Sequence, residues 1–227
     1  MDVDGDGGED LSLAPIAWNC TRARRADLRQ PPRLLTSLGR PPPSRRRPPD
    51  GFTCAACPKM TTPLIRAARP EDDPAIGELL VAGYLAAYAR KMPEVVVDEQ
   101  RKRDLRDVAS KRALARVLVA EHEGRVVGTV ALWPAGAPGS EAWLPGFCDL
   151  RHLATAPEVQ GRGFSQPLLD EAERLAREEL GASGVCLHVR RGNDGVRRLY
   201  EQRGYQRDPA GDLELPMVSL LAFAKRF

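Results

Sequence analysis

The chain has 227 residues, of which 42% are hydrophobic, and it carries a formal net charge of +3. This length and composition suit one globular domain with an appendage, and no run of about 18 apolar residues offers a membrane span. The first ten residues have neither the basic, apolar pattern of a secretory signal nor the basic character of a transit peptide, so we expect a cytoplasmic protein that does not contact membranes.

The excess positive charge comes from the beginning of the chain. Residues 1–59 contain ten Lys and Arg against seven Asp and Glu, which leaves 24 of the 34 basic and 24 of the 31 acidic residues for the remainder. Residues 60–227 are therefore neutral as a group. A nucleic-acid partner for this part of the chain is not expected, because such partners are recognised through an excess of basic residues.

Residues 1–59 are rich in Pro, Arg, Gly and Asp and show no sustained hydrophobic period. Such a segment buries too little apolar surface to offset the entropy of ordering it, so we predict a disordered tail, or an overcalled start with true initiation at Met60. The alternative is a basic binding arm that acts through Arg45, Arg46 and Arg47. We place the globular domain at residues 60–227.

The cysteines follow no framework spacing. The five are Cys20, Cys54, Cys57, Cys148 and Cys186. Cys54 and Cys57 form a C-x-x-C pair, but no second pair or His pair accompanies them, so no metal site is expected. Cys148 and Cys186 lie in apolar, strand-like runs, where a reduced cysteine acts as a small hydrophobic residue.

Regular structure is predicted from Met60 onward. Residues 64–68 have the composition of a strand, and a helix is expected to start within 69–74, where acidic residues stand near its positive end. Helical apolar spacing then continues to Tyr88. A second helix is predicted over 98–116, with a solvated charged face over the four apolar positions Leu105, Val108, Ala109 and Leu114.

The middle of the chain predicts a β-hairpin. Residues 117–121 and 125–133 are rich in strand-forming residues and are separated by a short turn that contains His122 and a glycine. The loop 134–145 follows. Trp133 and Trp143 stand beside this loop and are candidates for one wall of an acceptor site, with ordinary packing as the alternative.

The second half alternates strands and helices. A buried strand is predicted over 147–156, a strand over 184–189, and a short helix over 193–203 that ends at Gly204. The segments 205–207 and 213–223 complete the sheet. The apolar positions between 164 and 180 recur on one helical face: Phe164, Leu168, Leu169, Ala172, Leu175, Ala176 and Leu180. We predict an α/β protein of the α+β type, with a mixed, mostly antiparallel central sheet and helices on both faces.

A glycine-rich turn precedes this amphipathic helix. Helix N-termini present unpaired backbone N–H groups and partial positive charge, and glycines at 161 and 163 allow the chain to approach a phosphate closely. Pro167 in the first turn costs little. The dinucleotide fingerprint would need glycine at position 166, where Gln166 stands, and a P-loop would end in G-K-[ST]. The turn is interpreted as a cradle for a pyrophosphate.

Two motifs carry a family resemblance. The run from Gln160 to Ser165 follows Leu153–Pro157 and closely resembles the acyl-CoA loop [RQ]-x-x-G-x-[GA] of the GNAT superfamily of N-acyltransferases. Ser165 stands where that family usually has Gly or Ala. The run Asn193–Tyr205 resembles the later family segment N-x-x-[AV]-x-x-[LF]-Y-x-x-x-G-[FY]. The likeness covers about residues 64–227 and supports the GNAT-like fold.

The resemblance implies an acetyltransferase that moves an acetyl group from acetyl-CoA, its co-substrate, to a primary amine by direct ternary-complex transfer. The acceptor would be a small molecule or a peptide, and no metal is implied. The family's coenzyme contacts carry over to Leu153, Ala154, Thr155, Gln160, Gly161, Arg162, Gly163, Phe164, Ser165, Gln166 and Asn193. The alternative is a non-catalytic acyl-CoA-binding sensor, and a homodimer is left open.

The resemblance also suggests the catalytic groups. Tyr200 matches the tyrosine that protonates the departing thiolate, with packing at the helix end as the alternative. Asp149 stands where some members place an acidic base, with an ion pair to Arg151 as the alternative. Strand alternation puts Asp149 on the side of Arg151, Leu153 and Thr155 and leaves His152 on the opposite side. His122 and His188 are given no role. Loops at 90–116, 134–146 and 208–214 are expected to select the acceptor.

Overall fold

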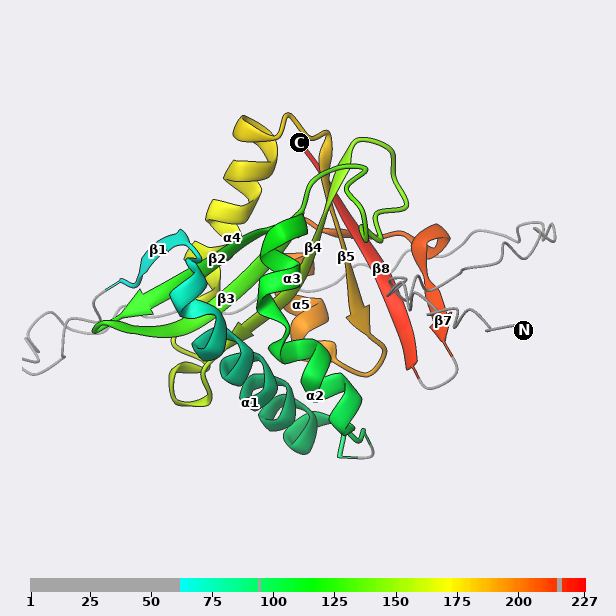
Figure 1. Cartoon of the computed structure of the whole chain (residues 1–227). Helices are drawn as coiled ribbons and strands as arrows, with labels where there is room; N and C mark the ends of the chain where they lie inside the picture. Colours follow the sequence, from blue (N-terminus) through cyan, green and yellow to red (C-terminus); the bar gives the residue numbers. More distant parts are fainter. Residues whose placement is uncertain (1–61, 94, 216–217) are drawn as a thin grey trace, which may run out of the picture. The chain divides into compact units, whose positions relative to one another are not determined.

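The computed structural model describes residues 62–93, 95–215 and 218–227 (Figure 1). The predicted tail, its arginine arm, and Cys20, Cys54 and Cys57 lie outside these residues and remain predictions. In the described part, eight strands form one sheet in the order β1-β2-β3-β4-β5-β8-β6, with β7 paired to β8. All neighbouring strands are antiparallel except β4 and β5, which are parallel. The predicted mixed, mostly antiparallel sheet is confirmed.

The strands are β1 (Leu64–Ala67), β2 (Arg116–His122), β3 (Arg125–Trp133), β4 (Phe147–Thr155), β5 (Gly184–Arg190), β6 (Gln206–Arg207), β7 (Leu213–Leu215) and β8 (Val218–Arg226). The helices are α1 (Asp73–Lys91), α2 (Glu99–Arg106), α3 (Val108–Leu114), α4 (Ser165–Arg174), its π-helical continuation (Leu175–Glu179), and α5 (Asp194–Gln202). Short 3₁₀ turns occupy Pro70–Asp72, Pro157–Val159 and Pro209–Gly211. None of the helices in the described ranges is long and apolar enough to cross a membrane.

Helices cover both faces of the sheet, with α1, α2 and α3 on one face and α4 and α5 on the other (Figure 1). Glycines allow the close approach on each side. A Cβ on Gly83 of α1 would lie 3.3 Å from the Cβ of Ala154, and a Cβ on Gly128 of β3 would lie 2.9 Å from Cδ1 of Leu168 in α4. The predicted apolar face of the 164–180 helix is buried against the sheet from Phe164 to Ala176, and Leu180 is partly buried.

The hairpin between β2 and β3 is tighter than predicted. Its turn consists of Glu123 and Gly124, with φ of 51° and 72°, the positive values that a two-residue type I′ turn requires. His122 is therefore the last residue of β2 rather than part of the turn. Its ring packs edge-on against Phe164, with 5.1 Å between the ring centroids.

The single helix predicted over 98–116 is wrong: α2 and α3 are separate. The chain breaks at Asp107, whose backbone is non-helical (φ −74°, ψ 71°) and whose carboxylate accepts a hydrogen bond from the N–H of Ser110. This is an N-cap, which starts a new helix. Leu105 and Val108 are buried, but Leu114 is 43% exposed and Ala109 is also exposed, so the buried stripe is shorter than predicted.

The parallel strands β4 and β5 touch closely at one end. Their pairing begins at Phe147 and Gly184, where a Cβ on Gly184 would lie 2.3 Å from the carbonyl oxygen of Lys225 and 2.4 Å from the Phe147 ring. Cys148 and Cys186 are free and buried in these strands, as expected. Burial raises the pKa of the Cys186 thiol to about 12, so it stays protonated and acts as an apolar side chain.

Candidate active site

The pairing of β4 with β5 ends partway along the two strands, and we call this gap in the strand pairing the slot. Their last paired residues are Leu150 and Leu187, but β4 continues to Thr155 and β5 to Arg190 (Figure 1). Beyond these pairs, each strand presents an edge with no partner strand. The predicted main-chain coenzyme contacts Leu153, Ala154 and Thr155 lie on this part of β4.

The helical layers meet through the slot. Lys91 at the end of α1 donates a hydrogen bond to Oδ1 of Asn193 at the start of α5, with 3.3 Å between the atoms. The Arg190 guanidinium lies 5.4 Å from the Tyr88 ring centroid. Two helices on opposite faces of a sheet reach each other only where no strand separates them. Asn193 stands at the N-cap position of α5 but makes no side-chain capping bond, so its amide faces α1 instead.

The glycine loop presents an open backbone surface. Gly161 and Gly163 have φ of 79° and 81°, and no heavy atom would lie within 4 Å of a Cβ at either position. In the described part of the chain, the N–H groups of Gly161, Gly163 and Phe164 donate to no backbone carbonyl. Helix α4 starts directly afterwards, at Ser165, so unpaired donors and the positive end of a helix coincide. The residues present fit a bound phosphate group.

The remaining loop side chains hold the loop in place. Gln160 Nε2 lies 3.4 Å from the carbonyl oxygen of Thr155, and Gln166 Oε1 accepts a hydrogen bond of 2.6 Å from Arg203 of α5. Phe164 is 5% exposed and packs into the core, so only its main chain is open to a ligand. Arg162 is exposed.

Tyr200 of α5 is buried, and its ring contacts that of Tyr205 edge-on with centroids 5.3 Å apart. Burial raises the pKa of Tyr200, and the nearby Tyr84 phenol of α1 raises it further. Burial similarly raises the pKa of Tyr84 to about 12. The Tyr200 hydroxyl makes no hydrogen bond with other described residues, so its proton is retained and uncommitted.

Asp149 is 1% exposed and forms the ion pair with Arg151 that the sequence offered as an alternative. Its Oδ2 accepts hydrogen bonds from Arg151 Nε at 2.7 Å and from the N–H of Glu141 at 2.8 Å. Glu141 also pairs with Arg151, at 3.2 Å. The role of Asp149 as a base stays a prediction, and its carboxylate already has protein partners.

The two tryptophans make packing contacts within the protein, and their role as an acceptor wall stays a prediction. Trp133 is 5% exposed, and its ring lies beneath the Arg151 guanidinium at 4.2 Å. Trp143 donates from Nε1 to Asp208 Oδ2 at 2.8 Å, and a Cβ on Gly211 would collide with its ring. Through Trp143, the loop 134–146 is joined to 208–214, two of the segments expected to select the acceptor. His188 is within 2.9 Å of the Gly211 carbonyl and belongs to the same contact.

His152 is the residue that sequence reasoning placed wrongly. The pairing of β3 with β4 shifts between Thr129–Ala154 and Ala131–Arg151, so β4 holds one extra residue there, and His152 has φ of 58°. Such a bulge re-aims side chains. The His152 ring lies 5.8 Å from the Trp133 ring, which Arg151 also contacts. His152 therefore shares the α1–α3 face with Arg151, contrary to strict alternation. A bulge depends on strand pairing and has no local sequence signal.

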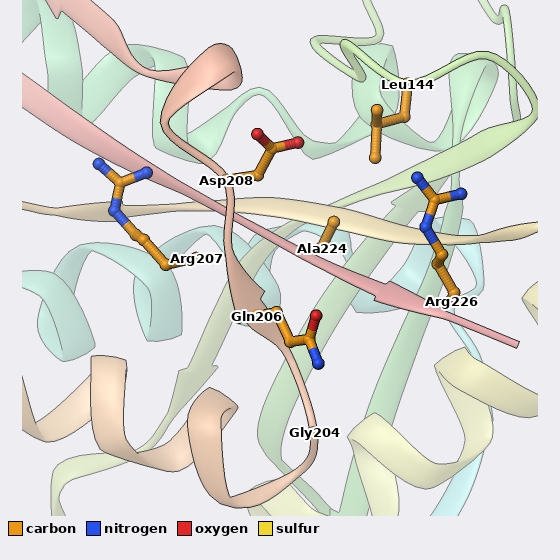
Figure 2. Close-up of a pocket in the computed structure, with 7 residues that line it drawn as sticks. All are labelled: Leu144, Gly204, Gln206, Arg207, Asp208, Ala224 and Arg226. Carbon is orange, nitrogen blue, oxygen red and sulfur yellow. The ribbon is translucent and has the colours of Figure 1, made fainter. Parts of the chain in front are cut away.

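A separate pocket lies at the sheet edge formed by β6 and β8 (Figure 2). It is lined by Leu144, Gly204, Gln206, Arg207, Asp208, Ala224 and Arg226. None of the predicted coenzyme or catalytic residues is among them. No cluster of three or more His, Cys, Asp or Glu suited to a metal ion occurs within the described ranges.

The comparisons with known proteins agree with this geometry. A profile of the acetyltransferase (GNAT) family matches residues 75–205. The chain therefore belongs to the GNAT family of acetyltransferases, and it is an N-acetyltransferase by family.

Solved structures share the fold. A GNAT-family acetyltransferase from Staphylococcus aureus Mu50 superposes with a TM-score of 0.57 at 14% identity, covering 72% of this chain and 98% of that one. PaiA N-acetyltransferase from Thermoplasma acidophilum, in complex with coenzyme A, gives 0.56 at 18%, covering 74% and 100%. A ribosomal-protein-alanine N-acetyltransferase from Brucella melitensis gives 0.50 at 24%, covering 72% and 99%.

Proposed function

We propose that the protein transfers the acetyl group of acetyl-CoA directly to a primary amine of a small molecule or peptide, with both substrates bound together. The observation that carries this proposal is the Gly161–Gly163 loop, whose open, unpaired N–H groups stand at the start of α4, next in the chain to the unpaired edge of β4. A diphosphate suits the loop because backbone donors and the helix end both favour anions. An extended amide-containing arm suits the edge, because it can pair with β4 as an added strand.

The coenzyme contacts follow from this placement. Gly161, Gly163 and Phe164 would bind the diphosphate through main-chain N–H groups, and Arg162 would add an exposed cation. The main chain of 153–155 would pair with the pantetheine arm. The side-chain amide of Asn193 would give up its hydrogen bond with Lys91 and bind the amide groups of the pantetheine arm instead. When bound, acetyl-CoA supplies an acetyl group activated as a thioester.

The transfer forms a C–N bond and breaks the C–S bond. The acceptor enters as an ammonium ion and leaves as an amide, so it loses two protons. Tyr200 gives its proton to the departing thiolate and is reprotonated with one of these two. The other leaves through a base to solvent, and we assign this step to Asp149, directly or through water. The burial of Tyr200 supports its role, because its phenol is protonated at neutral pH and its hydroxyl makes no hydrogen bond with other described residues.

Calorimetry and a thiol-release assay on the full chain test the proposal. We expect CoA and acetyl-CoA to bind with measurable heat, and thiol release from acetyl-CoA to depend on an added amine. Absence of both heat and a thermal shift at saturating coenzyme would contradict the site itself. Binding without turnover across small amines, amino acids and peptide N-termini would instead favour the acyl-CoA sensor.

A further inference from the structure

The helices α2 and α3 carry two kinds of cation. Three of them hold a carboxylate at 2.6–2.7 Å: Lys102 with Glu99, Arg106 with Glu78, and Arg112 with Asp73. Arg103 donates to the neutral side-chain amide of Gln100. Arg101 and Lys111 have no side-chain acceptor in the part of the chain that the structure describes. These two cations are therefore free to bind an anion from outside the described residues.

Both of these cations contact neighbouring helical segments without meeting a carboxylate. The Arg101 guanidinium lies 5.9 Å from the centroid of the Tyr84 ring. The Lys111 ammonium donates to the carbonyl oxygens of Asp104 and, at 2.7 Å, Asp107, which leaves one of its three N–H donors available. Partial burial lowers the pKa of Lys111. Its charge is therefore less screened by water than that of a fully exposed lysine.

The potential between these cations and β4 is positive. At the bulge, burial lowers the pKa of His152, and the charges of Lys111, Arg101 and Arg151 lower it further. The Nδ1 atom of His152 is buried and has no partner among the described residues, so an imidazolium there would be poorly solvated. Arg151 is already paired with Asp149 and Glu141. The uncompensated charge therefore belongs to Arg101 and Lys111.

This positive region adjoins the slot. Arg101 lies against Tyr84, and the phenol of Tyr84 is close enough to Tyr200 to raise the pKa of that residue. An amine that reacts beside Tyr200 would therefore be separated from Arg101 mainly by the side chain of Tyr84. A carboxylate near that amine would reach the unpaired cations, whereas a second ammonium group would be repelled.

We propose that Arg101 and Lys111 bind a carboxylate of the acceptor, so that the acceptor is an amine with a carboxylate close to its reacting nitrogen. This inference rests on the proposed acetyl transfer and narrows its acceptor class. The carboxylate can be the α-carboxylate of a free amino acid or the side-chain carboxylate of an acidic residue at a peptide N-terminus. Guanidinium and ammonium groups suit it through charge-assisted hydrogen bonds.

The experiment uses two matched acceptor pairs in the thiol-release assay with the full chain. Alanine is compared with alaninamide, and aspartyl-alanine amide with asparaginyl-alanine amide. We expect the acid of at least one pair to have kcat/KM about tenfold or more above its neutral partner, the effect of one charge-assisted hydrogen bond. The pair that responds identifies which carboxylate is read.

Variants locate the effect. Arg101→Gln and Lys111→Gln should each remove most of the difference between acid and amide, mainly through KM, and Arg101→Lys should restore part of it. Arg103→Gln is the matched control, because it removes the same charge from the same helix and Arg103 contacts only Gln100. It should leave the ratio unchanged, because Arg103 is not among the charges that act on His152. Melting temperatures check that each variant is folded.

Several results would overturn the proposal. These are equal kcat/KM for acids and amides, an equal fall in the ratio for Arg101→Gln and Arg103→Gln, or coenzyme binding without turnover of any of the four acceptors. Failure of coenzyme binding in calorimetry would reject the proposed function instead, so the two failures are distinguishable.

Discussion

The two halves of the candidate site are built from different materials. The coenzyme half consists largely of main chain: the Gly161–Gly163 loop, the start of α4 and the unpaired edge of β4. The proposed acceptor half consists of side chains from elements far apart in the sequence, among them Arg101, Lys111 and the residues at the β4 bulge. Binding through the backbone depends on glycine spacing and local conformation. Binding through side chains depends on how distant elements pack.

Because of this difference, a ligand class can be assigned directly to the coenzyme half but not to the acceptor half. A main-chain surface accepts one shape and charge, here a diphosphate, whatever the neighbouring side chains are. A side-chain surface changes with each substitution in α2, α3 or the loop 134–146. The acceptor half is accordingly where members of one fold can differ in substrate without a change of architecture.

The largest expected effect concerns Tyr200, the proposed proton donor to the departing thiolate. Tyr200→Phe should lower kcat by about 10²-fold, the usual contribution of a general acid, while calorimetric affinity for CoA stays unchanged. Tyr205→Phe is the matched control, because Tyr205 is a buried neighbour whose ring contacts Tyr200. If the Tyr200→Phe variant turns over at the wild-type rate, the departing thiolate takes its proton elsewhere.

A second prediction separates the two roles of Asp149. Asp149→Asn should lower the free energy of unfolding by about 3 kcal/mol, because it leaves Arg151 without its buried partner. Glu141→Gln removes the exposed partner of the same arginine and should cost less than about 1 kcal/mol. Urea unfolding measures both. A large loss of kcat in the folded Asp149→Asn variant would support its assigned role as a base, and an unchanged kcat would contradict that role.

The backbone character of the coenzyme half predicts that glycine matters more than charge. Gly163→Ala places a Cβ at a φ of 81°, at a strain of about 1–2 kcal/mol, and puts a methyl group at the open surface. We expect CoA binding about tenfold weaker by calorimetry. Gly136→Ala is the control, since Gly136 has φ of 70° and equally open surroundings. It should lose similar stability and no affinity.

The smallest effect concerns the pKa of His152, which burial lowers and the charges of Lys111, Arg101 and Arg151 lower further. The folded protein lowers the pKa of His152 below 6.5, so the unfolded chain binds more protons as the pH falls below that value, and stability is lost on the acid side. His152→Asn, which tolerates positive φ, should reduce the stability difference between about pH 7.5 and 5.5 by about 1 kcal/mol. Unfolding curves of wild type and variant at both pH values give the comparison. An unchanged difference would contradict the lowered pKa.

Most of the fold was predictable because its signals are local. The amphipathic α4, the β2–β3 hairpin and the glycine loop each depend on residues within a short window, and they occur as expected. The break at Asp107 also had a local signal, an N-cap three residues before Ser110, which the charge pattern of 98–116 obscured. The placement of the His152 side chain on the same face as Arg151 had no local signal, since it results from one extra residue of β4 in the pairing with β3.

The tight contact at Gly184 has a consequence for the width of the slot. Because the carbonyl of Lys225 and the ring of Phe147 leave no room for even a methyl group at this position, the joined end of β4 and β5 behaves as a closed vertex. The width of the slot at the other end then depends on the angle at which β4 and β5 diverge from this paired end. Gly184→Ala would push the two strands apart there and alter the width of the slot from a position outside the proposed coenzyme contacts.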